Sequence, residues 1–168
     1  MDLRLELQTL HRASFGWAMS CCRSQRQEAE DVLHSVYIKV LEGRARFDGR
    51  SSFRTWLFSV IHRTVQEHRR RHWFQAALLD RWRESEPLQA AAAGEDARAT
   101  DRERNSQLSS ALARLSRRQQ EVLHLVFYQD LTIEESARTL GLSLGSARTH
   151  FERGKKRLRA LLREDSLP

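Results

Sequence analysis

The scarcity of residues that break helices is the feature that most constrains this chain. Only two prolines and seven glycines occur among its 168 residues. Between them, apolar residues recur three and four positions apart, which is the spacing of one face of an α-helix, and no segment alternates as a half-buried strand does. The sequence therefore predicts an all-α fold.

The first part of the chain contains three predicted helices, which cover about residues 3–22, 27–42 and 51–73. Gly43 is a natural stop for the second. The residues expected on the buried sides of the first two helices are Leu3, Leu7, Leu10, Trp17, Cys21, Ala29, Val32, Leu33, Val36, Tyr37, Val40 and Leu41. Each set follows the period of an amphipathic helix, so the three helices should pack together.

Residues 83–107 differ in composition from the segments on either side. They hold Pro87, Gly94, an alanine run and mixed charges, with no apolar stripe to bury. Such a composition is typical of a flexible tether. We therefore predict two helical domains, residues 1–80 and 108–168, joined by a linker at residues 81–107.

The last part of the chain shows the signals of a helix-turn-helix. Two capping boxes are predicted, Ser116 with Gln119 and Thr132 with Glu135. Gly141 suits the left-handed residue that ends a helix, and Ser143 can cap the next one, leaving a turn of about three residues. The residues expected to face inward are Ile133, Ala137, Leu140, Leu144, Ala147 and Phe151.

The second helix of this pair is strongly basic, in a chain whose net charge is +7. Its cations are Arg148, Arg153, Lys155, Lys156, Arg157 and Arg159, against one early acid, Glu152. A recognition helix presents its first turns to base edges in the major groove, while cations behind them hold phosphate. Because caps, turn and charge agree, we favour DNA binding over a merely solvated helix.

Residues 51–63 combine three aromatic rings with three cations. Helical phase places Phe53, Leu57, Val60, Ile61 and Thr64 in one apolar stripe and leaves Phe58 outside it. Trp56 lies at the edge of the stripe, and Arg63 and Arg70 follow on the same flank. A flat ring beside cations suits single-stranded DNA, but phase alone slightly favours a Trp56 that merely closes the rim of the core.

Together these segments resemble a bacterial extracytoplasmic-function (ECF) sigma factor, the promoter-recognition subunit of RNA polymerase. In the family's region 2, the matching segments are EAEDVLHSVYIKVL and RFDGRSSFRTWL. In region 4, the match runs through LSRRQQEVLHLVFYQDLTIEESARTLGLSLGSARTHFERGKKRLRALL. The resemblance implies two helical domains on a tether, and the order of the motifs supports it.

The resemblance also implies roles for individual residues. It places a contact to the clamp helices of core polymerase at Asp31, His34 and Ser35. It places the loop from Asp48 to Ser52 beside the pocket for a flipped minus-ten base and makes Trp56 a melting residue. With the residues predicted from helical phase, the full minus-ten and melting set is Asp48, Gly49, Arg50, Ser51, Ser52, Phe53, Trp56, Arg63 and Arg70. The resemblance places Arg148 and Thr149 on the positions that read minus-thirty-five bases. With the residues predicted from the helix-turn-helix itself, the full minus-thirty-five set is Thr132, Ser143, Gly145, Ser146, Arg148, Thr149, Glu152, Arg153 and Lys156. From their own pattern, the leucines Leu115, Leu158, Leu161 and Leu162 are core residues, and the resemblance implies that they also serve in part a contact to the polymerase flap.

Some positions depart from the family's usual pattern. His34 and Ser35 replace a glutamine and an acid, and Arg63 replaces an asparagine near the minus-ten backbone. Ala147 and Glu152 replace a valine and a histidine or other residue of the recognition helix. The family's clamp pairing and promoter sequences therefore do not transfer directly, although Glu152 could accept a hydrogen bond from cytosine.

The implied partners are core polymerase, promoter DNA and an anti-sigma factor. Adjacent Cys21 and Cys22 are badly placed to bridge, and no spaced cysteine pair suggests zinc, so we expect a reduced cytoplasmic protein without metal or cofactor. The chain lacks an apolar run long enough to span a bilayer, so no membrane insertion is expected.

Parts of the sequence also fit other functions. The segment SARTHFERGKKRL is also similar to the helix-turn-helix of LuxR-type regulators, which would bind duplex DNA without polymerase. A nuclease using His62, His68 or His72 is the second alternative, but these histidines have no convergent carboxylates or metal-ligand spacing. We therefore predict that the chain is not an enzyme.

Overall fold

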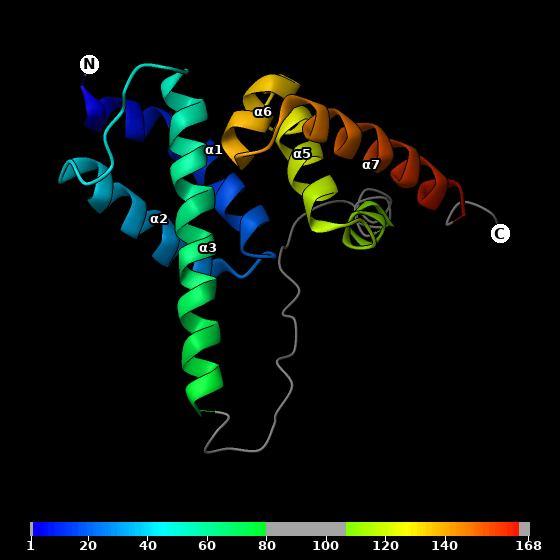
Figure 1. The fold of residues 1–168 in the computed structure, drawn as a ribbon, viewed down its shortest axis with the longest axis horizontal. Coiled ribbons are helices and arrows are strands. Elements are labelled where there is room, and N and C mark those ends of the chain that lie inside the picture. The colour runs from blue at the N-terminus through cyan, green and yellow to red at the C-terminus, as the bar shows by residue number, and fades with distance from the viewer. Residues whose placement is uncertain (1, 80–106, 165–168) are drawn as a thin grey trace, which may run out of the picture. The chain divides into compact units, whose positions relative to one another are not determined.

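The computed structural model describes residues 2–79 and 107–164, and all regular structure within these ranges is helical (Figure 1). The predicted all-α fold is confirmed. The chain divides into two compact units, unit 1 (Met1–Ala93) and unit 2 (Gly94–Pro168). Most of the predicted linker, residues 81–106, lies outside the described residues, so the predicted domain boundaries stay predictions.

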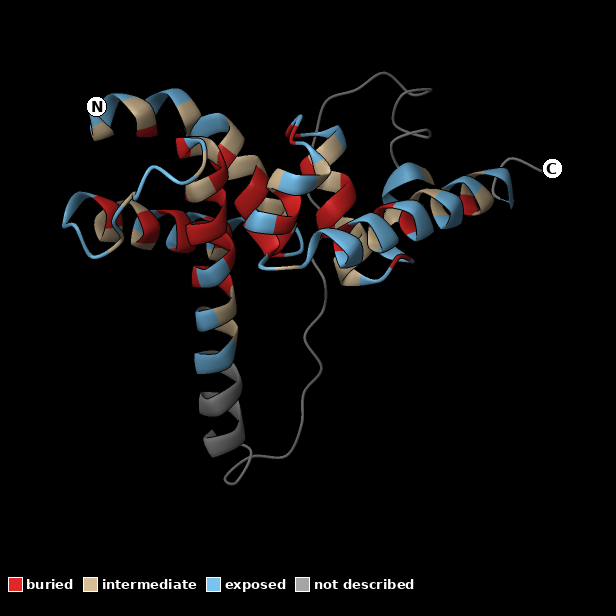
Figure 2. Cartoon of the chain, turned by 45° about the horizontal axis from the view of Figure 1, so that its top comes forward, coloured by how far each residue is buried: buried red, intermediate tan, exposed pale blue. Residues whose placement is uncertain are grey.

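Unit 1 consists of α1 (Leu3–Cys21), α2 (Arg26–Leu41) and α3 (Phe53–Leu79), each packed against the other two. Trp17 is fully buried at their centre, and its indole Nε1 donates to the carbonyl oxygen of Phe58 at 3.1 Å. Leu57 and Ile61 complete the α3 side of this core. Figure 2 shows that the buried residues described in α3 lie in its first half. The predicted three-helix arrangement is therefore confirmed.

Three details of unit 1 differ from the sequence prediction. Phe58 is fully buried because α1 and α2 both cover α3, which makes the buried face wider than one stripe. Leu41 was expected inside but is 50% exposed, since it is the last residue of α2. Finally, α3 continues to Leu79 instead of ending near residue 73.

Unit 2 contains a short helix at residues 107–113, followed by α5 (Arg117–Phe127), α6 (Ile133–Leu140) and α7 (Leu144–Glu164). Both predicted capping boxes are present, at Ser116 and at Thr132. Gly141 ends α6 in the left-handed conformation with φ of 65°, as predicted. Ser143 Oγ then accepts from the backbone amide of Ser146 at 3.1 Å, so the predicted cap of α7 is also confirmed.

The core of unit 2 lies where α7 packs against α5 and α6. Ala137, Leu140, Ala147 and Phe151 are buried as predicted. Leu144 was expected to face inward but is 37% exposed, because it is the first residue of α7 and no preceding helical turn covers it.

Cys21 and Cys22 are both buried and not bridged. None of the helices within the described residues has the length and apolar character needed to cross a membrane.

Candidate DNA and polymerase interfaces

The nine residues predicted to contact the minus-thirty-five element are all exposed. They are Thr132, Ser143, Gly145, Ser146, Arg148, Thr149, Glu152, Arg153 and Lys156. The buried residues of α7 recur at Ala147, Phe151, Gly154 and Leu161, so the opposite side of this helix faces solvent. Seven of the nine lie on the outer side of α7, which we call the α7 face: Gly145, Ser146, Arg148, Thr149, Glu152, Arg153 and Lys156.

Three cations on the α7 face are available to an external anion. Arg148, Arg153 and Lys156 are exposed and make no ion pair with another residue in the described ranges. Lys155 differs, because its Nζ lies 3.1 Å from Glu152 Oε1 and 4.9 Å from the centre of the Phe151 ring. Lys155 therefore partly neutralises the one acid on this face, while the other three cations can bind phosphate or base edges.

The hydroxyl groups on and next to the α7 face make hydrogen bonds within the protein. Ser143 Oγ donates to Ser146 Oγ at 2.9 Å, and Thr149 Oγ1 donates to the carbonyl oxygen of Gly145 at 2.9 Å. Thr132 Oγ1 donates to Glu135 Oε2 at 2.9 Å, within the capping box. These bonds determine which of the hydroxyls still has a proton for DNA.

The predicted minus-ten loop joins α2 to α3 and is held by local hydrogen bonds. Asp48 Oδ1 accepts from the backbone amide of Arg50 at 3.2 Å, and Gly49 has a φ of 74°, which favours glycine. Ser52 Oγ accepts from the amide of Thr55 at 3.2 Å and so caps α3. Asp48, Gly49, Arg50 and Ser52 are exposed, and Ser51 is half-buried.

Trp56 rests on two phenylalanines, directly after this loop. Its ring centre lies 5.2 Å from that of Phe53 and 5.5 Å from that of Phe47. Phe53 is only 8% exposed, whereas Trp56 is half-buried. The indole therefore packs on the buried Phe53 ring, while part of it remains accessible to solvent. Phe47 was not identified from the sequence, although it lies within the segment that resembles the family's melting region.

The flank of α3 that follows Trp56 along the chain is basic. Ser59 Oγ donates to the Trp56 carbonyl at 2.7 Å and accepts from Arg63 Nη2 at 3.1 Å. This chain of bonds holds the exposed Arg63 about two turns from Trp56. Arg70 is also exposed. The predicted line of tryptophan and cations is therefore present.

The predicted polymerase contacts lie on the surface of α2. Asp31 and His34 are exposed and Ser35 is half-buried. The Asp31 carboxylate accepts from Gln27 Nε2 at 3.3 Å, which orients it along the helix. In unit 2, Leu115 and Leu161 are buried, and Leu158 and Leu162 are half-buried, so the last two are the accessible part of the predicted flap contact.

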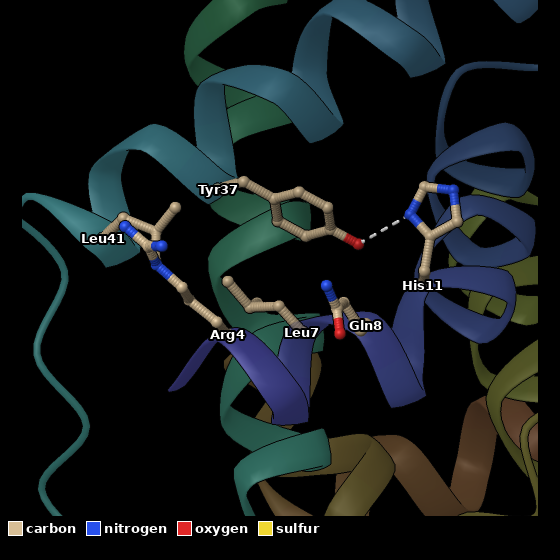
Figure 3. A pocket seen from close by; sticks show the side chains of 6 residues that line it. All are labelled: Arg4, Leu7, Gln8, His11, Tyr37 and Leu41. Carbon is tan, nitrogen blue, oxygen red and sulfur yellow. Dashed lines mark hydrogen bonds between the residues drawn. The ribbon is translucent and has the colours of Figure 1, made fainter. Parts of the chain in front are cut away.

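An apolar hollow of about 450 Å³ lies between α1 and α2 and was not predicted from the sequence (Figure 3). Its lining residues are Arg4, Leu7, Gln8, His11, Tyr37 and Leu41. The Tyr37 hydroxyl lies 3.1 Å from His11 Nδ1 at one end, and burial raises the pKa of Tyr37 above its usual value. No sequence signal identified this hollow, because it depends on how far the two helices diverge.

Comparison with known proteins agrees with this arrangement. A model of Sigma-70 region 2 matches residues 7–75, and a model of Sigma-70 region 4 matches residues 105–158. The ECF RNA polymerase sigma factor SigX of Bacillus subtilis is 32% identical over 146 residues, which are 83% of this chain and 75% of SigX. The chain belongs to the ECF sigma factor family. This ECF sigma factor is also 31% identical to the RNA polymerase sigma factor YlaC of Bacillus subtilis over 135 residues, covering 79% of the chain and 76% of YlaC.

The fold of this ECF sigma factor is similar to that of solved relatives. The sigma factor RpoE of Bartonella quintana, in complex with the anti-sigma factor NepR, gives a TM-score of 0.73 at 23% identity, over 96% of this chain and 97% of RpoE. CnrH, in complex with the cytosolic domain of CnrY, gives a TM-score of 0.64 over 96% of this chain and 88% of CnrH. The paired region 2 and region 4 matches favour a sigma factor over a LuxR-type regulator. The predicted family and function are confirmed, and the roles of single residues stay predictions.

Proposed function

We propose that this sigma factor binds core polymerase through unit 1, reads the minus-thirty-five element with the α7 face, and holds melted minus-ten DNA against Trp56 and residues 48–52. The observation that carries the proposal is the accessible indole supported by two rings, next to a polar loop and a basic helix flank. In this division, residues 1–80 and 108–168 act as separate DNA-binding domains, and residues 81–107 connect them.

Capture of melted DNA by Trp56 follows from the chemistry of an unpaired base. A flipped base loses its stacking and pairing, which costs a few kcal/mol, and an aromatic ring can restore about 1–3 kcal/mol by stacking. Arg63 and Arg70 lie where they can follow the phosphates of the same strand. Trp56 thus supplies the stacking surface, and its phenylalanine support keeps that surface in place.

We expect Trp56→Ala to slow promoter opening more than it weakens closed-complex binding. The direct measurement is permanganate reactivity of thymines around the start site, using holoenzyme assembled from the variant and core polymerase. Trp56→Phe is the matched control, because it keeps a flat ring and should retain most of the opening. Unchanged permanganate footprints for Trp56→Ala would rule out the melting role.

The α7 face should bind DNA partly through charge. We expect Arg153→Ala and Lys156→Ala each to weaken the salt dependence of DNA binding, because each removes roughly one phosphate contact. The slope of log DNA affinity against log salt concentration should fall in magnitude by about 1 for each variant. Arg163→Ala, in the last turn of α7, is the control and should leave the slope unchanged. Equal slopes for the unsubstituted protein and the three variants would contradict phosphate binding by Arg153 and Lys156.

We propose an anti-sigma factor as a further partner, since RpoE of Bartonella quintana was solved in complex with one. The hollow between α1 and α2, whose lining includes Leu41 at 50% exposure, offers an apolar surface on unit 1 to a protein partner. Leu41→Glu should therefore weaken co-purification of the chain with its anti-sigma factor and leave the helical content of the chain unchanged. Leu108→Glu, which is at an exposed site of unit 2, is the control.

Sigma factors in general are not enzymes, and we propose that this one likewise acts only by binding. Its place of action is then the bacterial cytoplasm, where core polymerase is. Purified core polymerase that initiates at a target promoter equally well without this chain would contradict the proposal as a whole.

A further inference from the structure

The hydroxyl proton of Thr149 is not available to DNA in this structure. Thr149 Oγ1 donates it to the carbonyl oxygen of Gly145, one turn earlier on α7, at 2.9 Å. A threonine hydroxyl has one proton, so what Thr149 presents outward is its γ-methyl group and the remaining acceptor capacity of the oxygen. Thr149 is nevertheless exposed, on the α7 face.

Ser146, the neighbouring hydroxyl on this face, has the opposite hydrogen-bonding character. Ser146 Oγ accepts the proton of Ser143 Oγ at 2.9 Å, and the Ser143 oxygen in turn accepts from the Ser146 amide at 3.1 Å. The Ser146 proton is therefore available to an acceptor on a base or phosphate. One turn of α7 thus presents a donor at Ser146 and a methyl group at Thr149.

Gly145 leaves the surface of α7 open to close approach one turn before Thr149. A Cβ built at Gly145 meets no atom within 4 Å, so the surface one turn before Thr149 is open. Residues four apart on a helix are neighbours on its surface, and the base edges at the floor of the major groove can approach Thr149 across this gap. Among the four bases, thymine alone carries a methyl group on that edge.

On the basis of the proposed minus-thirty-five role of the α7 face, we propose that Thr149 selects a thymine through contact between its γ-methyl group and the thymine 5-methyl group. Thr149 does not donate a hydrogen bond to a base. The competing arrangement is a rotated threonine that releases Gly145 and donates to a base acceptor, because threonine has two accessible rotamers in helices. The two arrangements predict opposite results when either the methyl group or the hydroxyl group is removed.

The test uses holoenzyme reconstituted with core polymerase and a promoter that it transcribes. Each thymine of the minus-thirty-five element is replaced in turn by deoxyuridine, which lacks only the methyl group, and the affinity of closed-complex formation is measured. At the thymine read by Thr149, the replacement should weaken binding roughly fourfold, as burial of one methyl group would predict. At the same position, 5-methylcytosine should bind more tightly than cytosine by a similar factor.

Two variants assign this methyl effect to Thr149. Thr149→Val keeps the methyl group and removes the hydroxyl, so the deoxyuridine penalty should persist. Thr149→Ser keeps the hydroxyl and removes the methyl group, so the penalty should vanish. The proposal is overturned if Thr149→Ser keeps the penalty and Thr149→Val loses affinity, or if no thymine shows a penalty that depends on residue 149.

A scrambled minus-thirty-five element distinguishes this inference from the proposed function. If scrambling weakens holoenzyme binding but no thymine methyl effect depends on residue 149, the inference about Thr149 fails alone. If scrambling has no effect, the proposed minus-thirty-five role of the α7 face fails as well.

Discussion

At the scale of single residues, Gly154 allows α7 to pack closely on α5. A Cβ at this position would lie 3.1 Å from both Gln119 Cβ and Leu123 Cδ1. Gln119 Cβ is attached to the backbone of α5 and cannot move without it, so the added carbon must push the helices apart. We expect Gly154→Ala to destabilise unit 2 by about 1–2 kcal/mol, a typical cost of overpacking. Urea unfolding followed through NMR signals of unit 2 in the full chain measures this.

Gly145→Ala is the matched control for Gly154→Ala. Both glycines lie in α7, but a Cβ at Gly145 meets nothing within 4 Å. Alanine there should be neutral or slightly stabilising, because it lowers the entropy lost on helix formation. Equal urea midpoints for the two variants would show that α5 and α7 do not need a glycine where they meet.

His124 should make unit 2 sensitive to acid. Burial lowers the pKa of His124 to about 4, from an ordinary value near 6.5, and its ring stacks on Tyr128 with centres 5.3 Å apart. Between pH 6.5 and 4 the unfolded chain takes up a proton that the folded unit does not, so stability falls as the pH falls. The loss should be on the order of 2–3 kcal/mol. His124→Gln should flatten the pH dependence of unit 2 unfolding, and an unchanged dependence would assign it to other groups.

At the scale of helices, α6 depends strongly on its cap. It has only eight residues, Ile133–Leu140, so it contains few internal hydrogen bonds. Thr132 Oγ1 accepts from the Glu135 amide at 3.1 Å, and the Thr132 amide donates to Glu135 Oε2 at 2.9 Å. We expect Thr132→Ala to cost about 1 kcal/mol. Hydrogen exchange of the α6 amides should quicken in Thr132→Ala but not in Thr132→Ser, which keeps the hydroxyl; equal exchange in both would show that the cap is dispensable.

The helix ends and turns of unit 2 could be predicted from the sequence because their chemistry is local. Thr132 and Glu135 are three residues apart, and Gly141 needs only its own backbone conformation to end α6. The α7 face was predictable for the same reason, since a helix with one apolar side places its cations on the other. These features depend on spacing along the chain and not on distant neighbours.

Features that depend on which other parts of the fold cover a residue could not be predicted from the sequence. Phe58 is buried because α3 is covered on two sides, which the phase of α3 alone does not reveal. Phe47 supports Trp56 from a loop, where no period applies. Leu41 and Leu144 have the right phase but lie at helix ends, where neighbouring turns stop covering them.

At the scale of the whole molecule, the two units should unfold separately. The four tryptophans of the sequence, Trp17, Trp56, Trp73 and Trp82, all precede Gly94, where unit 2 begins, so unit 2 contains none. Tryptophan fluorescence therefore reports on unit 1, while circular dichroism reports on the helices of both. Leu161 is fully buried in unit 2, and Leu161→Ala should cost about 2–5 kcal/mol there. This variant should shift part of the circular dichroism transition to lower urea and leave the fluorescence transition in place.

Leu57→Ala is the reciprocal variant, because Leu57 is fully buried in unit 1. It should move the fluorescence transition and spare the part of the circular dichroism change that belongs to unit 2. If Leu161→Ala moves the fluorescence midpoint as far as Leu57→Ala does, the chain unfolds as one cooperative body, and two independently folded DNA-binding domains are ruled out. Separate transitions would instead mean that neither unit needs the other in order to fold. Each unit would then keep its own binding face intact whatever the distance between the two promoter elements.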